Sequence, residues 1–107
     1  MPHRALFQVG ARSNCGKPLC CSKHDGYPKH KVHAAASVGD YHCDLPPWTF
    51  EAMIKRIRDE HPEGFDFIFL TGDYPAHDVW RQNRTTNLEA TRIVTNVISK
   101  YFPSKAS

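Results

Sequence analysis

The sequence lacks the hallmarks of several protein classes. Its longest apolar stretches fall far short of the roughly 18 residues that a membrane-spanning helix needs. The first ten residues contain no apolar core of a secretory signal peptide. Basic residues between positions 17 and 31 alternate with glycine, proline and cysteine, and no dedicated nucleic-acid-binding motif is present. We therefore expect no transmembrane segment, no signal peptide in this sequence and no nucleic-acid partner.

What is present suits one small domain. The chain has 107 residues, of which 40% are hydrophobic and 23% charged, ordinary values for a soluble protein. A chain of this length has room for a modest core. The formal net charge is +3 with neutral histidines, and seven histidines would add positive charge in an acidic compartment.

Four cysteines lie in a region of 38 residues, 10–47, that is rich in glycine and proline. Loops of this length are uncommon unless something ties them down. An even number of cysteines in such a loop favours two disulfides and an oxidising compartment. Because Cys20 and Cys21 are adjacent, they favour different partners, and we prefer Cys15–Cys20 with Cys21–Cys43.

Zinc is the competing interpretation of this region, because four histidines accompany the cysteines: His24, His30, His33 and His42. Zinc modules pair their ligands at spacings such as C-x₂₋₄-C and H-x₃₋₅-H. The spacing Cys15-x₄-Cys20 fits loosely, and His30-x₂-His33 is one residue short. Disulfides are therefore favoured over a small Cys/His zinc module or free thiols.

Residues 48–103 are predicted to form a helix, a buried strand and a second helix. The first helix has Thr49 as its N-cap and places four apolar side chains on one face, Phe50, Met53, Ile54 and Ile57. The apolar run 65–70 suits a strand buried on both faces. The second helix begins with a T-x-x-E capping box, Thr86 to Glu89, and keeps an apolar face to Phe102.

The candidate functional residues follow the predicted strand. Gly72 lets the chain turn at the strand end, and Asp73, His77 and Asp78 come within six residues. The carboxyl ends of strands are where α/β folds place ligands. This pattern indicates a metal or phosphate site. The alternative is that Asp73 only caps the turn.

Asn83-Arg84-Thr85 is the one N-glycosylation sequon in the chain. It lies in the predicted loop before the second helix. Asn83 is therefore a candidate glycosylation site in a disulfide-bearing protein.

Three stretches, 9–21, 41–49 and 71–80, resemble the acid sphingomyelinase family, within the calcineurin-like metallophosphoesterase superfamily. The last of them reads Thr-Gly-Asp-Tyr-Pro-Ala-His-Asp-Val-Trp. Their order and spacing also match, and the similarity covers residues 7 to 103. The resemblance implies an α/β fold, here a partial metallophosphoesterase sandwich of disulfide-tied loop, helix, buried strand and helix.

The resemblance also implies function. The family hydrolyses sphingomyelin, at a membrane surface, to ceramide and phosphocholine with two Zn²⁺ ions, and its relatives cleave other phosphodiesters. Asp73 matches the metal-bridging aspartate, and His77 matches the histidine that protonates the leaving group. The pairing of Cys15 with Cys20 and Cys21 with Cys43 is implied as well. The family is lysosomal or extracellular.

The chain also departs from the family pattern. An Asp-x-His metal pair expected just before Gln8 is missing, and an Asn-His-Glu motif expected after the second helix is absent. We therefore expect residues 1–107 to be a fragment of one catalytic domain that is inactive alone, because one ligand does not hold two zinc ions. The alternatives are a non-enzymatic secreted disulfide-containing binding module and the small Cys/His zinc module.

Overall fold

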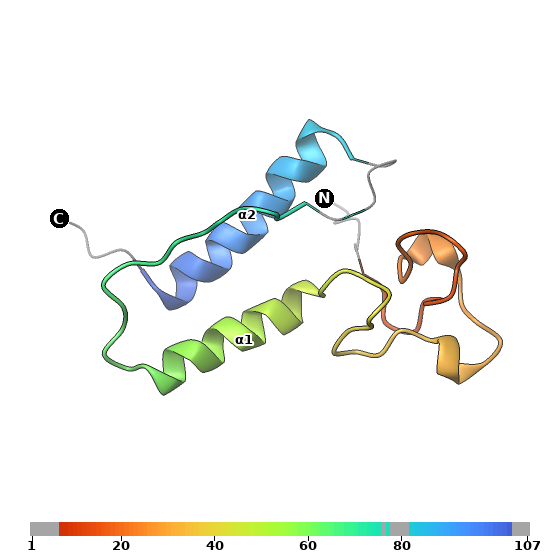
Figure 1. Ribbon diagram of the computed structural model, residues 1–107, viewed down its shortest axis with the longest axis horizontal. Helices are drawn as coiled ribbons and strands as arrows, with labels where there is room; N and C mark the ends of the chain where they lie inside the picture. Colours follow the sequence, from red (N-terminus) through yellow and green to blue (C-terminus); the bar gives the residue numbers. More distant parts are fainter. Residues whose placement is uncertain (1–6, 76, 78–81, 104–107) are drawn as a thin grey trace.

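The computed structural model of the chain describes residues 7–75, 77 and 82–103. It contains two α-helices, α1 (Pro47–Glu60) and α2 (Arg84–Tyr101), and two short 3₁₀ turns, η1 (Lys23–Asp25) and η2 (Lys31–His33). Figure 1 shows α1 and α2 packed against each other and running in the same direction. The disulfide-bonded part of the chain lies beyond the first turn of α1.

The first helix begins three residues earlier than a cap at Thr49 would place it. Pro46 is its N-cap and Pro47 occupies its first position, where a missing N–H costs nothing. Thr49 lies inside the first turn, and its hydroxyl donates to the carbonyl of Val38 at 2.8 Å. The prediction of Thr49 as N-cap is therefore wrong, because its hydroxyl ties the helix to the preceding loop instead.

The second helix also begins earlier than predicted, with Asn83 as its N-cap. The Asn83 Oδ1 accepts the Thr86 N–H at 2.9 Å, and the Thr86 Oγ1 accepts the Asn83 N–H at 2.9 Å. Thr86 thus serves as the third residue of the helix and not as its cap. Asparagine is a stronger N-cap than threonine, which explains why the earlier start is preferred.

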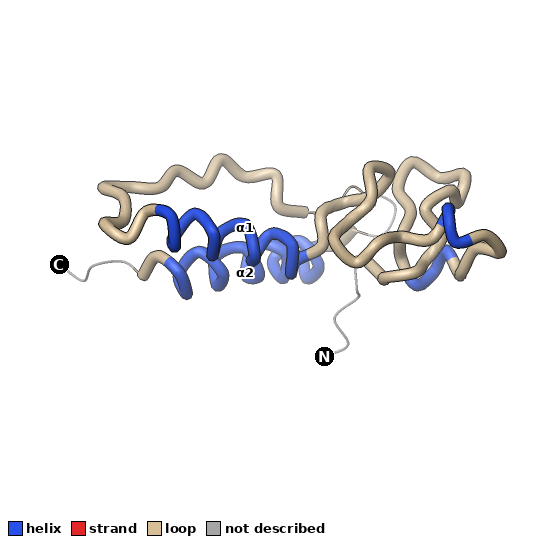
Figure 2. Tube along the Cα trace, turned by 90° about the horizontal axis from the view of Figure 1, so that it is seen from below, coloured by secondary structure: helices blue, strands red, loops and turns tan. Residues whose placement is uncertain are grey.

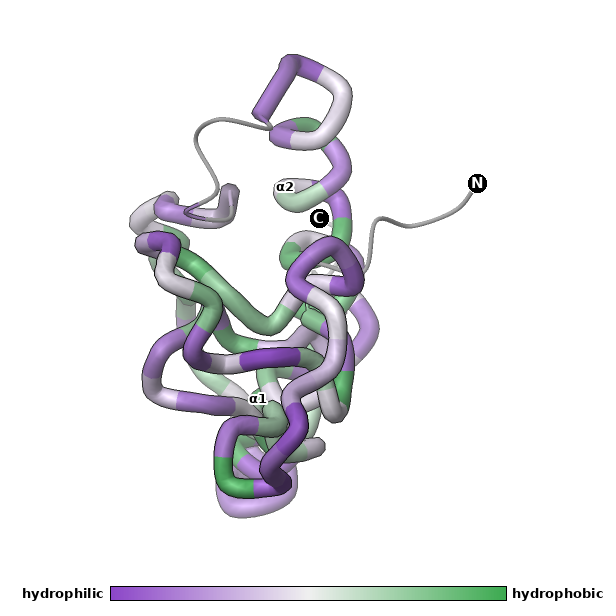
Figure 3. Tube along the Cα trace, turned by 90° about the vertical axis from the view of Figure 1, so that its right-hand side faces the viewer, coloured by the Kyte–Doolittle hydropathy of each residue, from purple (hydrophilic) through white to green (hydrophobic). Residues whose placement is uncertain are grey.

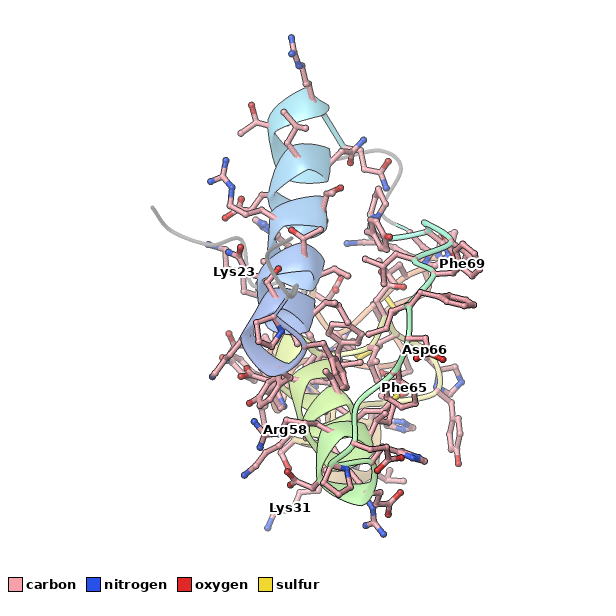
Figure 4. All side chains as sticks on the ribbon, turned by 90° about the vertical axis from the view of Figure 1, so that its left-hand side faces the viewer. Lys23, Lys31, Arg58, Phe65, Asp66 and Phe69 are labelled. Atoms are coloured by element: carbon pink, nitrogen blue, oxygen red, sulfur yellow. A yellow bond between two sulfur atoms is a disulfide. The ribbon has the colours of Figure 1, made fainter. Side chains whose placement is uncertain are left out.

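The predicted strand at 65–70 is wrong for this chain. Within the described ranges no residue belongs to a β-strand, and pairing is limited to isolated bridges, Arg12 with Ala34 and Ala36 with Gly39. Segment 65–70 runs back along the helix pair (Figure 2). Phe67 is 71% exposed and Phe69 is 82% exposed, and Figure 4 shows Phe69 pointing away from the helices.

The physical reason is the lack of a partner. An apolar, aromatic run favours a strand only where neighbouring strands accept its backbone hydrogen bonds. The described part of the chain supplies none beside residues 65–70. The architecture seen here is therefore two helices and a disulfide-bonded loop, and an α/β sandwich is not shown.

Both predicted disulfides are confirmed, Cys15–Cys20 and Cys21–Cys43, and none of the four cysteines is free. They belong to a buried hydrophobic cluster of Phe7, Cys20, Cys21 and Ala35, against which Cys15 and Cys43 pack. Hydrophilic residues predominate along the tube at the near, disulfide-bonded end in Figure 3. A zinc module would need thiolates, which these bonds remove.

The helix pair is packed less tightly than the disulfide-bonded end. Ile54 is the buried residue of α1 and Ala90 that of α2. Of the predicted apolar stripe, Phe50 and Ile57 are half-buried, while Met53 is exposed. Polar contacts also join the two helices: near the end of α2, Tyr101 donates to the Glu51 Oε1 of α1 at 2.9 Å, and Lys100 pairs with the same oxygen at 2.8 Å. Neither helix in the described part is long and apolar enough to cross a membrane.

Candidate functional site

A pocket of about 580 Å³ lies between the helix pair and residues 68–75. Its walls are apolar side chains of both helices, Phe50, Ile54, Ala90, Ile93, Val94 and Ile98. Its titratable side chains are Asp44, Asp73, Tyr74 and His77. The structure thus brings both predicted site residues, Asp73 and His77, to one pocket.

His77 is held by Asp44, which precedes it by 33 residues. The Asp44 Oδ1 lies 2.5 Å from the His77 Nδ1, and the Asp44 Oδ2 accepts the backbone N–H of His77 at 2.8 Å. The Asp44 side chain is 21% exposed and that of His77 is 70% exposed. One carboxylate therefore fixes both the backbone and the ring, and leaves Nε2 as the ring nitrogen not engaged by Asp44.

This contact changes the acidity of the ring. The hydrogen bond to Asp44 and the charge of that carboxylate raise the pKa of His77 above its ordinary value, while partial desolvation opposes the effect. The charge of Asp73 acts in the same direction as that of Asp44. His77 therefore keeps its proton to a higher pH than a free histidine, as a proton donor requires.

Asp73 lies in the predicted turn. Gly72 has φ +93° and Asp73 has φ +64°, a left-handed backbone that aspartate tolerates better than most residues. Among the described residues the Asp73 carboxylate makes no hydrogen bond or ion pair. Ala76, whose N–H a capping aspartate at position 73 would bind, lies outside the described residues, so the alternative that Asp73 caps its turn stays open.

A zinc site is not complete around Asp73. In the described part of the chain one group of three metal-type side chains has its ligand atoms within 4.8 Å of one another, namely Cys21, Asp40 and Cys43. Both of its sulfur atoms belong to a disulfide and are not thiolates. The described residues therefore do not fit one zinc ion, and still less two.

The comparisons with known proteins identify relatives of one kind, although no family model matches the chain. Sphingomyelin phosphodiesterase B of Dictyostelium discoideum is 39% identical over 101 residues, which is 94% of this chain and 16% of that protein. The human sphingomyelin phosphodiesterase is 39% identical over 97 residues, 90% of this chain and 15% of the relative. The chain belongs to the sphingomyelin phosphodiesterase family.

The chain is also similar to a nematode member of the family. Sphingomyelin phosphodiesterase 1 of Caenorhabditis elegans is 32% identical over 98 residues, 92% of this chain. In each case the chain spans about a sixth of the relative's length. The resemblance to the family read from residues 9–21, 41–49 and 71–80 is thus confirmed, and with it the enzyme class, a hydrolase family.

For this family member, sequence reasoning missed Asp44. The residue lies inside the stretch 41–49 that carried the resemblance, but the sequence analysis gave it no role. The available signal was an acidic residue directly after a half-cystine and before two prolines. Asp78, the second acid of the motif, lies outside the described residues.

Asn83 is exposed and begins α2. The helix N-terminus therefore presents the sequon on the surface of this sphingomyelin phosphodiesterase relative. Its Oδ1 is engaged by Thr86, whereas a glycan is attached through Nδ2. Capping and glycosylation are thus chemically compatible.

Proposed function

We propose that this chain supplies Asp73 and His77 to the active site of a zinc-dependent phosphodiesterase that hydrolyses sphingomyelin to ceramide and phosphocholine. The observation that carries the proposal is the Asp44–His77 contact at a pocket that Asp73 also lines. The substrate class is supported by the names of the relatives.

His77 is the proton donor in this proposal. When the bond between phosphorus and the leaving oxygen breaks, negative charge develops on that oxygen. The imidazolium breaks its N–H bond and forms an O–H bond there, so that the leaving group departs neutral and the ring becomes neutral imidazole. The raised pKa of His77 supports this role, because the proton must still be present before the reaction.

Asp73 is the metal ligand in this proposal. Its carboxylate would be one of the ligands of the zinc, and the metal, when bound, would supply Lewis-acid chemistry. Since the described residues do not complete a zinc site, the remaining ligands must come from elsewhere in a functional protein. The 107-residue chain alone is therefore proposed to hold no zinc and to be inactive.

The proposal extends to the fold and the compartment. Residues 65–70 form a strand of an α/β sandwich when neighbouring strands are supplied, which would cover the exposed Phe67 and Phe69. The parallel course of α1 and α2, with this segment returning beside them, fits such a unit (Figure 1). The two disulfides support a lysosomal or extracellular location.

A non-enzymatic binding module is the second candidate. It is favoured by the position of the buried hydrophobic cluster of Phe7, Cys20, Cys21 and Ala35, which lies in the disulfide-bonded part and away from the pocket. A module of this kind would keep its function when Asp73 and His77 are replaced. The two candidate functions therefore predict different results when Asp73 and His77 are replaced.

The experiment that separates them is a chimera. The matched segment of the Dictyostelium discoideum sphingomyelin phosphodiesterase B is replaced by the corresponding residues of this chain, and sphingomyelin hydrolysis and zinc content are measured. We expect His77→Gln to lower activity by about 10²- to 10⁴-fold with zinc retained, and Asp73→Asn to lower both. His42→Gln, at a loop histidine paired with Asp40, is the matched control. Undiminished hydrolysis by the His77→Gln chimera would overturn the proposal.

A further inference from the structure

Asp44 and His77 join two parts of the chain that are distant in sequence. The two contacts use different oxygens of one carboxylate, Oδ1 for the ring and Oδ2 for the backbone N–H. A ring bound in this way is restricted about both of its side-chain torsions, because the backbone and the ring are held by the same group. The pair therefore sets where His77 lies relative to the pocket.

A second aspartate–histidine pair in the loop differs from Asp44–His77 in how its contacts are made. Asp40 also accepts the backbone N–H of a histidine, His42, at 2.9 Å and lies 3.0 Å from its Nδ1. There, one oxygen makes both contacts over two residues, as in a local turn. The Asp44–His77 pair spans 33 residues, and so it is a tertiary contact that the turn at residue 77 does not create.

Asp44 is well placed to act as a fixed support. It directly follows Cys43, which is bonded to the fully buried Cys21. On its other side Pro46 is fully buried and α1 begins at Pro47. The carboxylate is thus attached to backbone that is held on both sides.

We propose that Asp44 is the positioning residue of His77: it binds the Nδ1 proton and the backbone N–H, and so presents Nε2 as the nitrogen that transfers the proton. This inference rests on the proposed function of His77. The Asp44 carboxylate stays ionised throughout, since the proton that leaves comes from Nε2 and passes to the leaving oxygen. Asp44 does not itself touch the reacting atoms.

The groups that face His77 allow its titration to report on this contact. Along with Asp44, the titratable side chains lining the same pocket are Asp73 and Tyr74. The raised pKa of His77 is due first to the hydrogen bond that its ring donates to Asp44 and then to the charge of that carboxylate, with a smaller contribution from Asp73. Replacing Asp44 by its uncharged isostere should therefore remove most of the shift.

The test is an NMR titration of the histidine rings in the full 107-residue chain, with His77 assigned by comparison with His77→Gln. In the unmodified chain we expect a midpoint above the ordinary value of 6.5, and a neutral ring protonated at Nδ1 by long-range ¹H–¹⁵N correlation. Asp44→Asn should move the midpoint down toward 6.5 and abolish the tautomer preference. Asp44→Glu should restore part of the shift, because it returns the charge.

Asp40→Asn is the matched control and should leave the His77 titration unchanged. A His77 midpoint at the ordinary value in the unmodified chain would overturn the inference without any variant. So would an Asp44→Asn chain that keeps its disulfides and its His77 titration. In the chimera, Asp44→Asn should lower kcat more than it raises KM and shift the pH profile toward acid. If the His77→Gln chimera stays active, the proposed function fails, while the ring titration still decides the role of Asp44.

Discussion

At the scale of single residues, Asp25 shows how this loop keeps a carboxylate out of water. Its side chain is 2% exposed and accepts from Lys17 Nζ at 2.8 Å and from the Ser22 N–H and Oγ at 2.9 Å each. Burial opposes the charge, but the hydrogen bonds from Lys17 and Ser22 outweigh it and hold the pKa of Asp25 below its usual value.

Asp25→Asn should lower the free energy of unfolding by about 1.5 to 3 kcal/mol, the range for hydrogen bonds to a charged group. Because the folded-state pKa lies below the unfolded value of 3.8, the contribution is present above about that pH and is lost as the pH falls through the folded-state pKa. Urea unfolding at several pH values measures it. Asp59→Asn, at an exposed partner of Arg58, should have little effect; equal losses in the two variants would contradict this account of Asp25.

Single residues also mark the limit of what the sequence could predict. Asp73 and His77 were found because they lie close together in one motif. The adjacency of Cys20 and Cys21 predicted only that they have different partners, and the family resemblance implied the pairing of Cys15 with Cys20 and Cys21 with Cys43. Asp44 was missed because its partner lies 33 residues away. No local pattern identifies a tertiary contact at that distance.

At the scale of the elements, helices were predicted well and their starts poorly. The apolar periodicity located both helices, but each begins before its predicted cap. The start of α1 is at two prolines and has no capping side chain, and α2 begins after Asn83, a stronger cap than threonine. The strand at 65–70 failed for a different reason. A helix closes its own hydrogen bonds, whereas a strand depends on partners that the described chain does not offer.

The start of α2 combines a cap with a sequon, and two substitutions separate them. Asn83→Ala should remove both and destabilise the helix by about 1 kcal/mol. Thr85→Ala should abolish glycosylation in a secreting cell but leave the cap, because the capping partner of Asn83 is Thr86. Mass spectrometry and thermal unfolding measure the two effects. An Asn83→Ala chain as stable as the Thr85→Ala chain would show that the cap contributes nothing.

At the scale of the whole molecule, the chain is less compact than its length allows. Its radius of gyration is 15.8 Å, against about 13 Å for a compact domain of this size. The extents of 53 × 31 × 24 Å describe an elongated body. The excess follows from the arrangement in Figure 1, where the disulfide-bonded part extends the helix pair lengthwise instead of covering it.

The exposed face of residues 65–70 should make the chain self-associate. Phe67 and Phe69 contact each other, with ring centroids 5.1 Å apart, and both are largely exposed. Replacing both by lysine should shift the concentration dependence of the sedimentation coefficient toward the monomer. Tyr41→Lys removes an even more exposed aromatic side chain from the loop and should not shift it. A similar change with Tyr41→Lys would indicate nonspecific association.

The neighbouring half-cystines Cys20 and Cys21 have a consequence for how the protein reaches its oxidised form. Exchanging their partners changes the size of each closed ring by a single residue, so loop entropy barely separates the native isomer from the swapped one. The choice has to be made by the folded backbone, in which Cys21 is fully buried with φ +68°. Early oxidation should therefore trap both isomers. Their interconversion by thiol–disulfide exchange would then set the pace of maturation, over minutes to hours unless an isomerase intervenes.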